Sequence, residues 1–284
     1  MTAAIAPVLK YPGSKWKLAN WIIKHMPKHE SYLEPFFGSG AVFFRKPPLE
    51  NETIGDIDGD IVNLFKMIRD RSDELAKLVE MTPWSRFEFE SIEAETSAES
   101  SFIHSGDSLE DARRFLIRCW MAYGAKTDGK VGWACNIRPT TYGAITKRWN
   151  QVPTNILAIS TRLKNAQIEC QPSVKLIQRY RYPGVLIYAD PPYVRSTLTQ
   201  RHYKHMMTNS QHIELLEALN EHPGPVLLSG YQSKLYSDYL SHWKTKAINA
   251  YAQGTKLRQE ILWINPVAAK DIEQTLDFDF ENIS

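Results

Sequence analysis

One short stretch constrains the fold of this chain more than any other. The apolar run Val185–Ala189 is followed at once by the polar tetrapeptide Asp190-Pro191-Pro192-Tyr193. The run has the length and the residue types of a buried β-strand. In open α/β sheets ligands bind beyond the carboxyl ends of the strands, so we expect the tetrapeptide at a ligand-binding edge. The alternative is a Pro-Pro turn that only ends a buried strand.

The tetrapeptide suits a planar ligand that carries an amine. Its two prolines have no N–H group and a fixed φ near −65°, so the carbonyl groups beside them are left to accept hydrogen bonds. Asp190 adds a carboxylate acceptor, and Tyr193 adds a flat aromatic face. Acceptors in the plane of a ring and an aromatic side chain against its face together predict the binding of an amine-bearing ring.

A second informative stretch is Glu34–Gly40, with the sequence Glu-Pro-Phe-Phe-Gly-Ser-Gly. We expect a short strand over 32–33, a turn that carries Gly38 and Gly40, and a helix through 42–44. Glycines in such a turn let the backbone approach a ligand closely. The stretch lacks the ending of a phosphate-binding loop and the full dinucleotide fingerprint. Its acidic first residue also favours a positively charged ligand, although an ordinary strand-turn-helix unit is the alternative.

The stretch 53–58 predicts a short strand that ends at Asp56. A carboxylate at the end of the second strand of a βαβ unit can accept both hydroxyl groups of a ribose. The alternative for Asp56 is a helix N-cap. In the earlier turn over 10–15, Ser14 is predicted to cap the helix that follows. Lys15 of the same turn is either a site residue or a solvated surface charge. These stretches predict a nucleoside-containing cofactor with a cationic centre.

The order of the predicted elements indicates one doubly wound α/β domain with an insertion. We place the main domain at residues 1–71 and 166–284 and a mainly helical inserted region at 72–165. No apolar run approaches the roughly 18–20 residues that span a membrane. The N-terminus lacks a secretory signal, and the three cysteines have no metal-type spacing, so we expect no membrane, no metal and a cytoplasmic protein.

Basic segments lie on either side of the tetrapeptide in the sequence. The net charge is only +2, but a locally basic face can bind phosphate even on a nearly neutral chain. The loop 124–138 combines glycines, basic residues and an Asp-Gly hairpin signal, and 194–210 is a long polar loop. An ordinary surface hairpin is the alternative. The predicted DNA-binding residues are Lys126, Lys130, Trp133, Asn136, Arg138, Lys147, Arg148, Arg195, Arg201, Tyr203 and Lys204.

Taken in order, these stretches resemble the Dam-like family of DNA N(6)-adenine methyltransferases, in the form common in phages and prophages. Residues 10–15 are similar to the family's Lys-Trp-x-Gly-Gly-Lys, and residues 34–40 to its Glu-Pro-Phe-x-Gly-x-Gly. Residues 55–60 are similar to its Ala-Asp-Ile-Asn-x-Asp, and residues 190–193 to its catalytic motif. Tyr11, Ser14 and Asp58 depart from these patterns, and the inserted region matches loosely, so the target sequence stays open.

The resemblance implies a Rossmann-like methyltransferase sheet that transfers a methyl group from S-adenosyl-L-methionine to an adenine flipped out of double-stranded DNA. It implies an enzyme that acts as a monomer, or as a dimer on DNA. Whether a restriction enzyme accompanies it stays open. The predicted catalytic residues are Asp190, Pro191, Pro192 and Tyr193. The predicted cofactor-binding residues are Tyr11, Lys15, Glu34, Phe36, Gly38, Gly40, Asp56, Ile57 and Asp190.

Two other functions fit parts of this pattern. Another amino-group methyltransferase could act on RNA adenine, cytosine N4 or a protein glutamine, because the tetrapeptide alone does not exclude these substrates. A catalytically silent DNA-binding protein could keep the same fold, although the intact Asp190 and Tyr193 argue against it.

Overall fold

The computed structural model describes residues 6–94, 104–123, 131–138, 144–195, 204–251 and 257–281. The expected Asp-Gly hairpin and four predicted DNA-binding residues lie outside these ranges, namely Lys126, Lys130, Arg201 and Tyr203. Within the described part of the chain, no helix is both long enough and apolar enough to cross a membrane.

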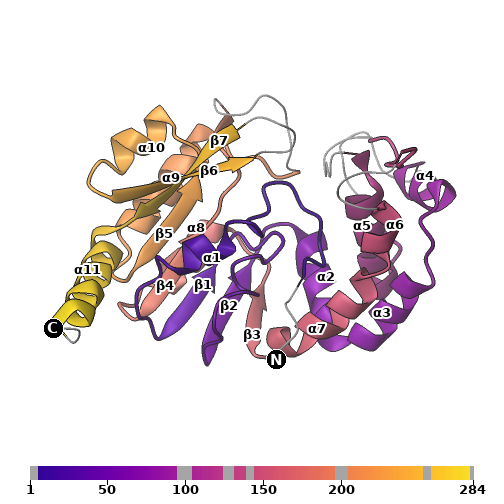
Figure 1. The fold of residues 1–284 in the computed structure, drawn as a ribbon, viewed down its shortest axis with the longest axis horizontal. Helices are drawn as coiled ribbons and strands as arrows, with labels where there is room; N and C mark the ends of the chain where they lie inside the picture. Colours follow the sequence, from indigo (N-terminus) through magenta and orange to yellow (C-terminus); the bar gives the residue numbers. More distant parts are fainter. Residues whose placement is uncertain are drawn as a thin grey trace.

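A seven-stranded mixed sheet forms the centre of the molecule (Figure 1). Its order is β3-β2-β1-β4-β5-β7-β6, with β1 to β5 parallel and β7 antiparallel to both of its neighbours. The strands are β1 (Ser31–Glu34), β2 (Asn51–Gly55), β3 (Ala166–Glu169), β4 (Val185–Ala189), β5 (Val226–Gly230), β6 (Lys244–Tyr251) and β7 (Leu257–Ile264). The predicted doubly wound α/β sheet is confirmed.

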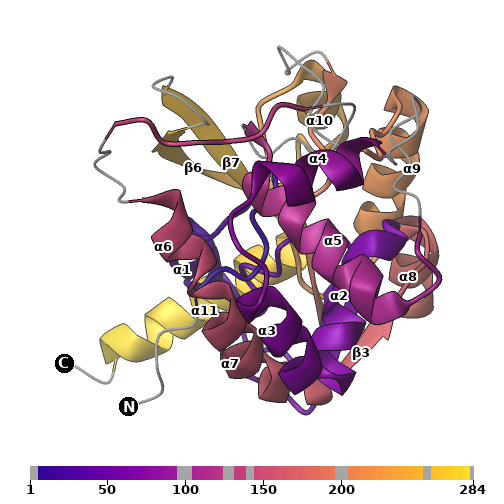
Figure 2. The same ribbon diagram turned by 90° about the vertical axis from the view of Figure 1, so that its right-hand side faces the viewer.

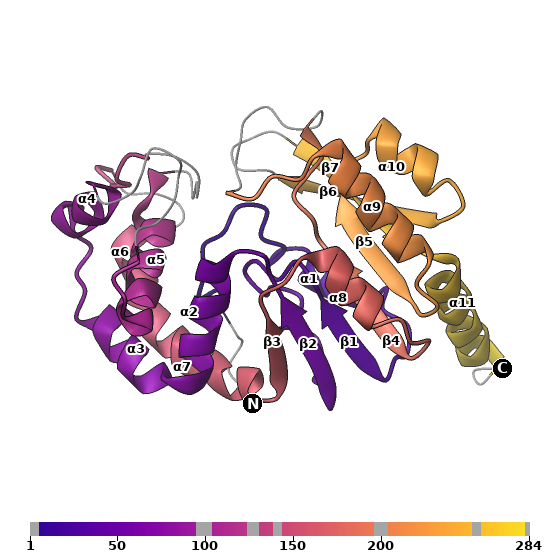
Figure 3. The same cartoon turned by 180° about the vertical axis from the view of Figure 1, so that it is seen from behind.

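Helices cover both faces of this sheet. They are α1 (Ala19–Ile23), α2 (Gly59–Asp70), α3 (Ser72–Glu80), α4 (Arg86–Ala94), α5 (Ser108–Met121), α6 (Ile145–Trp149), α7 (Val152–Lys164), α8 (Ser173–Arg179), α9 (Asn209–Asn220), α10 (Lys234–Tyr239) and α11 (Pro266–Glu281). Residues of α8, α9 and α10 form one apolar cluster, and those of α1, α2, α7 and α11 belong to another. Figure 3 shows α8 and α9 over the face that is hidden in Figure 1.

The burial of the central strands explains the two layers of helices. Every residue of β4 and β5 is buried, so both faces of these strands need an apolar cover. Helix α2 packs farther along the sheet, against β3, α5 and α7, and buries the stripe Ile61, Leu64, Phe65 and Ile68. The side chain of Asp58 caps this helix by accepting a hydrogen bond from the Asp60 backbone N–H at 3.1 Å. The N-cap alternative for Asp56 is therefore wrong.

Helices α3 to α7 lie together beyond β3 and face the viewer in Figure 2. Long-range polar contacts hold this group together. Arg118 of α5 donates to Glu93 of α4 at 2.9 Å, and both side chains are buried. The Trp149 indole N–H donates to the carbonyl oxygen of Thr82 at 2.7 Å. These helices fall within residues 72–165, which agrees with the mainly helical region expected there.

The structure differs from expectation at three places. A series of turns replaces the helix expected through 42–44, because Gly40 has a positive φ of 65° and two prolines follow Lys46, which leaves too few residues for a stable helix. Ser14 does not cap a helix, since its hydroxyl shares a hydrogen bond of 2.7 Å with Ser39. Strand β6 was not anticipated, because its polar, lysine-containing sequence is that of an edge strand.

Candidate active site

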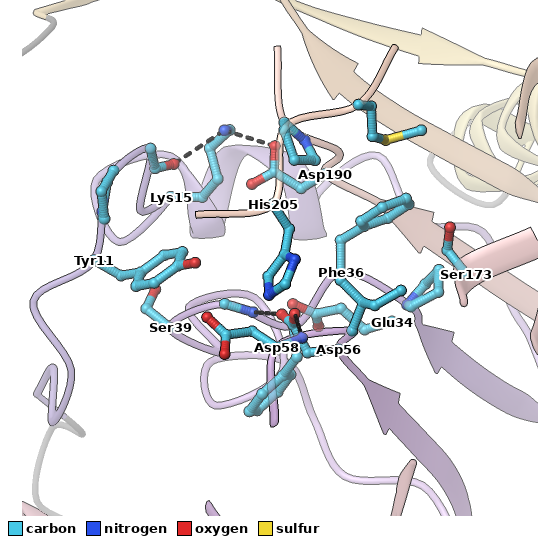
Figure 4. Close-up of a pocket in the computed structure, with 18 of the residues that line it drawn as sticks. Tyr11, Lys15, Glu34, Phe36, Ser39, Asp56, Asp58, Ser173, Asp190 and His205 are labelled. Carbon is cyan, nitrogen blue, oxygen red and sulfur yellow. Dashed lines mark hydrogen bonds and ion pairs between the residues drawn. The ribbon is translucent and has the colours of Figure 1, made fainter. Parts of the chain in front are cut away.

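A cavity of about 420 Å³ lies at the carboxyl ends of three neighbouring strands (Figure 4). Glu34 ends β1, Asp56 follows β2, and Asp190 follows β4. The chain order of the strands reverses between β1 and β4, so the cavity opens at the point where α/β sheets bind ligands. The predicted site residues that line it are Tyr11, Lys15, Glu34, Phe36, Gly38, Asp56, Ile57, Asp190 and Pro192.

Asp56 keeps acceptor capacity for a ligand. Its Oδ2 accepts a hydrogen bond from the Gly38 N–H at 2.9 Å, and its Oδ1 accepts one from the Asp58 N–H at 2.9 Å. A carboxylate has about four lone-pair positions, so about two remain for hydroxyl groups of a ligand. Burial raises the pKa of Asp56 to about 6, although the backbone N–H groups of Asp58, Gly38 and Ile57 oppose this shift.

Gly38 and Gly40 have different tasks. Gly38 lines the cavity with a positive φ of 48°, and an added Cβ would meet the Tyr11 ring at 3.5 Å. Gly40 is not among the cavity-lining residues, although it was predicted to bind the cofactor. An added Cβ there would lie 2.5 Å from the Phe37 ring and 2.6 Å from the Phe44 ring. Gly40 therefore permits packing beneath the turn.

We expect Gly40→Ala to destabilise the fold by about 3 kcal/mol, because alanine meets a left-handed backbone and two aromatic rings. The free energy of unfolding in urea measures this loss. Gly59→Ala is the matched control, since an added Cβ at Gly59 meets no atom within 4 Å and alanine favours the start of α2. It should leave stability unchanged or raise it by up to about 1 kcal/mol. Equal losses in the two variants would contradict the packing role of Gly40.

Two neighbouring groups hold one oxygen of Asp190. The Lys15 ammonium forms an ion pair with Asp190 Oδ1 at 2.7 Å, and the Ser229 hydroxyl donates to the same oxygen at 2.9 Å. Both contacts use Oδ1, so within the described part of the chain Oδ2 is left to accept from a ligand. The side chain of Asp190 is 19% exposed, so a ligand in the cavity can reach its carboxylate.

Lys15 is buried, so the alternative of a solvated surface charge is wrong. Besides Asp190, its ammonium contacts Glu260 Oε1 at 3.3 Å, the Tyr193 hydroxyl at 2.9 Å and the Gly13 carbonyl oxygen at 3.1 Å. Burial lowers the pKa of Lys15, but Asp190 and Glu260 outweigh it and raise the pKa well above its ordinary value. Lys15 is therefore a permanent cation at the heart of the site.

The ring of Tyr193 already has a partner. It stacks on the Tyr231 ring with centroids 4.1 Å apart and planes 22° apart. Its hydroxyl group accepts from Lys15 and donates to Glu260 Oε2 at 3.3 Å. The sequence indicated an open aromatic face, and it gave no sign of these contacts.

Glu34 does not supply the fixed negative charge that the sequence indicated. The Tyr32 hydroxyl donates to its carboxylate at 2.7 Å. Burial raises the pKa of Glu34 to about 8, and the nearby Asp190 charge adds to the rise. Glu34 is therefore largely protonated at neutral pH, and the cationic centre of a ligand has no full charge to meet there.

The described DNA-binding candidates occupy three kinds of position. Lys204 lines the cavity, and its ammonium forms ion pairs with Asp60 at 2.8 Å and Asp58 at 3.3 Å. Trp133 packs against the core, with the Arg86 guanidinium 4.8 Å from its ring centroid. The exposed candidates lie on segments near α5, on α6 and after the tetrapeptide, namely Asn136, Arg138, Lys147, Arg148 and Arg195.

Several residues of the site were missed by sequence reasoning. Ser229, Tyr231 and Glu260 surround the tetrapeptide, and His205 and Met207 line the cavity. Glu260 had a visible signal, because it is a charged residue at the start of an apolar strand. His205 and Met207 lie in the polar loop 194–210 that the sequence already singled out, whereas Ser229 and Tyr231 carry no signal that separates them from ordinary residues at a strand end.

The geometry can now be compared with known proteins. A family model described as D12 class N6 adenine-specific DNA methyltransferase matches residues 11–254. The chain belongs to this family. The match spans the residues that line the cavity, the tetrapeptide and the helices of 72–165, and it shows that the chain is an adenine-specific DNA methyltransferase.

Individual relatives of this D12-class chain agree. It is 25% identical over 248 residues to the DNA adenine methylase of Escherichia coli K12, which covers 84% of this chain and 86% of that protein. It is 26% identical over 211 residues to the type II methyltransferase M.MjaIII of Methanocaldococcus jannaschii, with 66% and 69% covered. The Dam-like family predicted from the motifs is thereby confirmed.

Proposed function

We propose that this D12-class enzyme transfers the methyl group of S-adenosyl-L-methionine to the N(6) amine of an adenine that has been flipped out of duplex DNA. The observation that carries the proposal is the placement of Asp56 and Asp190 on one cavity at neighbouring strand ends. One carboxylate suits the sugar of a nucleoside cofactor, and the other suits an amine. Both ligands must meet in one cavity for direct transfer.

The residues of the cavity fit such a cofactor. The volume of about 420 Å³ lies within the usual range for small-molecule sites. Asp56 keeps acceptor positions for two hydroxyl groups, and Gly38 leaves open space beside the Tyr11 ring. Phe36 and Ile57 add apolar surface for a flat base. When bound, S-adenosyl-L-methionine supplies a methyl group on a positively charged sulfur, which is a good electrophile.

The tetrapeptide prepares the nucleophile. The lone pair of the adenine amine is delocalised into the ring, so the amine is a poor nucleophile by itself. Asp190 Oδ2 and the Pro191 carbonyl oxygen would accept its two hydrogens and favour a pyramidal nitrogen. Lys15 and Ser229 hold Oδ1, so the orientation of the carboxylate is set before the adenine enters. As the new bond forms, the amine would release one proton along its hydrogen bond to Asp190 Oδ2, and positioning supplies much of the rate.

An adenine inside a duplex cannot reach this cavity, so we propose that the base is flipped out at a cost of a few kcal/mol. Tyr193, which stacks on Tyr231 and does not line the cavity, would then support the tetrapeptide that holds the flipped base. We assign residues 1–71 and 166–284 to catalysis and residues 72–165 to recognition of the DNA sequence. The enzyme would act as a monomer, in the cytoplasm, on cellular or phage DNA.

Arg138 is our test of the DNA-contacting surface. Its side chain is exposed beside the helical region, so it is placed to contact a phosphate group. We expect Arg138→Ala to weaken duplex binding several-fold and to reduce the slope of log K against log salt by about 1. Fluorescence anisotropy over a salt series measures both, and affinity for the cofactor should not change.

Arg69→Ala is the matched control, because Arg69 is paired with Asp70 at the far end of α2 from the cavity. It should leave the affinity and the salt slope unchanged. An Arg138→Ala protein with the affinity of the wild type across the salt series would remove Arg138 from the interface.

A substrate panel tests the proposed function against its rivals. Purified protein is supplied with methyl-labelled S-adenosyl-L-methionine and with duplex DNA, RNA or protein in turn. The proposal predicts incorporation into duplex DNA. Incorporation into RNA or protein alone would replace it with another amino-group methyltransferase. Cofactor binding without any incorporation would favour a silent DNA-binding protein.

A further inference from the structure

Glu260 is a buried acidic residue beside the active site that the mechanism above does not use. It lies on β7, where the next residue, Ile261, pairs with Gly230 at the end of β5. Its side chain is 3% exposed, and it is not among the residues that line the cavity. Glu260 therefore acts on the candidate active site only through the residues that it contacts, Lys15 and Tyr193.

Its contacts go to two residues of the catalytic centre. Glu260 Oε1 forms an ion pair with the Lys15 ammonium at 3.3 Å. Glu260 Oε2 accepts a hydrogen bond from the Tyr193 hydroxyl at 3.3 Å. Lys15 in turn holds Asp190, and Tyr193 is the last residue of the tetrapeptide. One carboxylate thus connects both ends of the catalytic motif.

The position is costly for a purely structural residue. Taking a carboxylate out of water costs several kcal/mol, and an apolar residue of similar size would often be at least as stable there. The rest of the strand shows that an apolar residue is acceptable, because Ile261, Leu262, Trp263 and Ile264 are all buried. Burial also raises the pKa of Glu260, which records the same cost. The charged carboxylate makes two contacts that an apolar side chain could not make, one with Lys15 and one with Tyr193.

We propose that Glu260 is a positioning residue for methyl transfer, which seats the Lys15 ammonium on Asp190 and fixes the Tyr193 hydroxyl. The Lys15 ammonium contacts two carboxylates and the Tyr193 hydroxyl. These contacts fix the position of the ammonium, and the ammonium in turn fixes the position of the Asp190 carboxylate. The direction of Asp190 Oδ2 toward an incoming amine then depends on Glu260. This inference rests on the proposed function, since it concerns the same reaction.

The test compares Glu260→Ala with Glu260→Gln in steady-state methylation of duplex DNA. Alanine removes both contacts, so we expect kcat to fall about 100-fold. Glutamine keeps a polar acceptor on a side chain of the same length, so the kcat of Glu260→Gln should be at least tenfold higher than that of Glu260→Ala. The KM for DNA and the Kd for S-adenosyl-L-methionine should stay within about threefold, because Glu260 does not line the cavity. Rates are divided by the number of cofactor-binding sites measured by calorimetry, which corrects for unfolded protein.

Glu52→Gln is the matched control. Glu52 is also a buried carboxylate on a strand, and it is paired with Lys46 and Arg162, away from the cavity. Its variant should lose stability and keep the wild-type kcat for each cofactor-binding site.

Two results would overturn the inference. One is a kcat for each binding site within twofold of wild type in both Glu260 variants, which is the behaviour of a merely structural residue. The other is a loss confined to KM or to Kd, which would make Glu260 a binding element. If the wild-type protein does not methylate adenine, the proposed function fails instead, so the two failures are distinguishable.

Discussion

Asp190→Ala should lower the rate of methyl transfer by about 10³-fold or more and leave the affinity for DNA within about threefold. The carboxylate is the acceptor that we assign to the adenine amine, and positioned proton acceptors typically contribute 10²–10⁴-fold. It also holds Lys15, so its removal leaves that cation with Glu260 as its remaining carboxylate partner. The exposed basic residues that we propose as phosphate contacts lie elsewhere, so DNA binding should survive.

Incorporation of a labelled methyl group under single-turnover conditions measures this loss, and fluorescence anisotropy measures DNA binding in the same preparation. Asp70→Ala is the control, because Asp70 is an exposed residue at the end of α2 whose partner is Arg69. Methyl transfer at a tenth of the wild-type rate or faster in the Asp190 variant would show that the reaction does not depend on this carboxylate.

Asp56→Asn should weaken the binding of S-adenosyl-L-methionine about 100-fold, or about 2.7 kcal/mol. An ionised carboxylate can accept from two hydroxyl groups, whereas an amide has one acceptor oxygen and it must also serve the Gly38 N–H. The wild-type affinity should also depend on pH. With a pKa of about 6, Asp56 is charged above pH 6 and protonated below it, so affinity should fall as the pH drops from 7 to 5.

Calorimetric titration of the cofactor at several pH values measures both effects. The Asn variant should bind weakly with no step near pH 6, because its side chain does not titrate. Glu34→Gln is the control, since the pKa of Glu34 is about 8 and its titration lies above this window. It should keep the step near pH 6. A wild-type affinity that is flat between pH 5 and 7 would contradict the assignment of Asp56 to the hydroxyl groups.

Much of the site could be predicted from the sequence because it depends on strand ends. The runs before Asp56 and Asp190 have clear strand patterns, and parallel strands bring their carboxyl ends to one edge. Local pattern therefore determined which residues would share the cavity. The same reasoning predicted that Gly38 and Gly40 both line the ligand site. Gly38 lines the cavity, whereas Gly40 has a packing role instead.

The electrostatics of the site could not be predicted in this way. Lys15 and Glu260 are 245 positions apart, and their contact exists only because β7 inserts beside β5. The neutral state of Glu34 follows from its burial and from the nearby Asp190 charge, which a strand pattern does not reveal. Charges respond to surroundings that many elements build together, so their protonation states and pairings appear only in the folded chain.

The central claim is that this chain methylates the N(6) amine of adenine in DNA. It is tested most directly by expressing the wild-type protein and the Asp190→Ala variant in a host that lacks adenine methylation and sequencing the host DNA for modified bases. The account predicts N(6)-methyladenine at a recurring sequence with the wild-type protein and none with the variant. N4-methylcytosine, or unmodified DNA despite a folded protein that binds S-adenosyl-L-methionine, would contradict it.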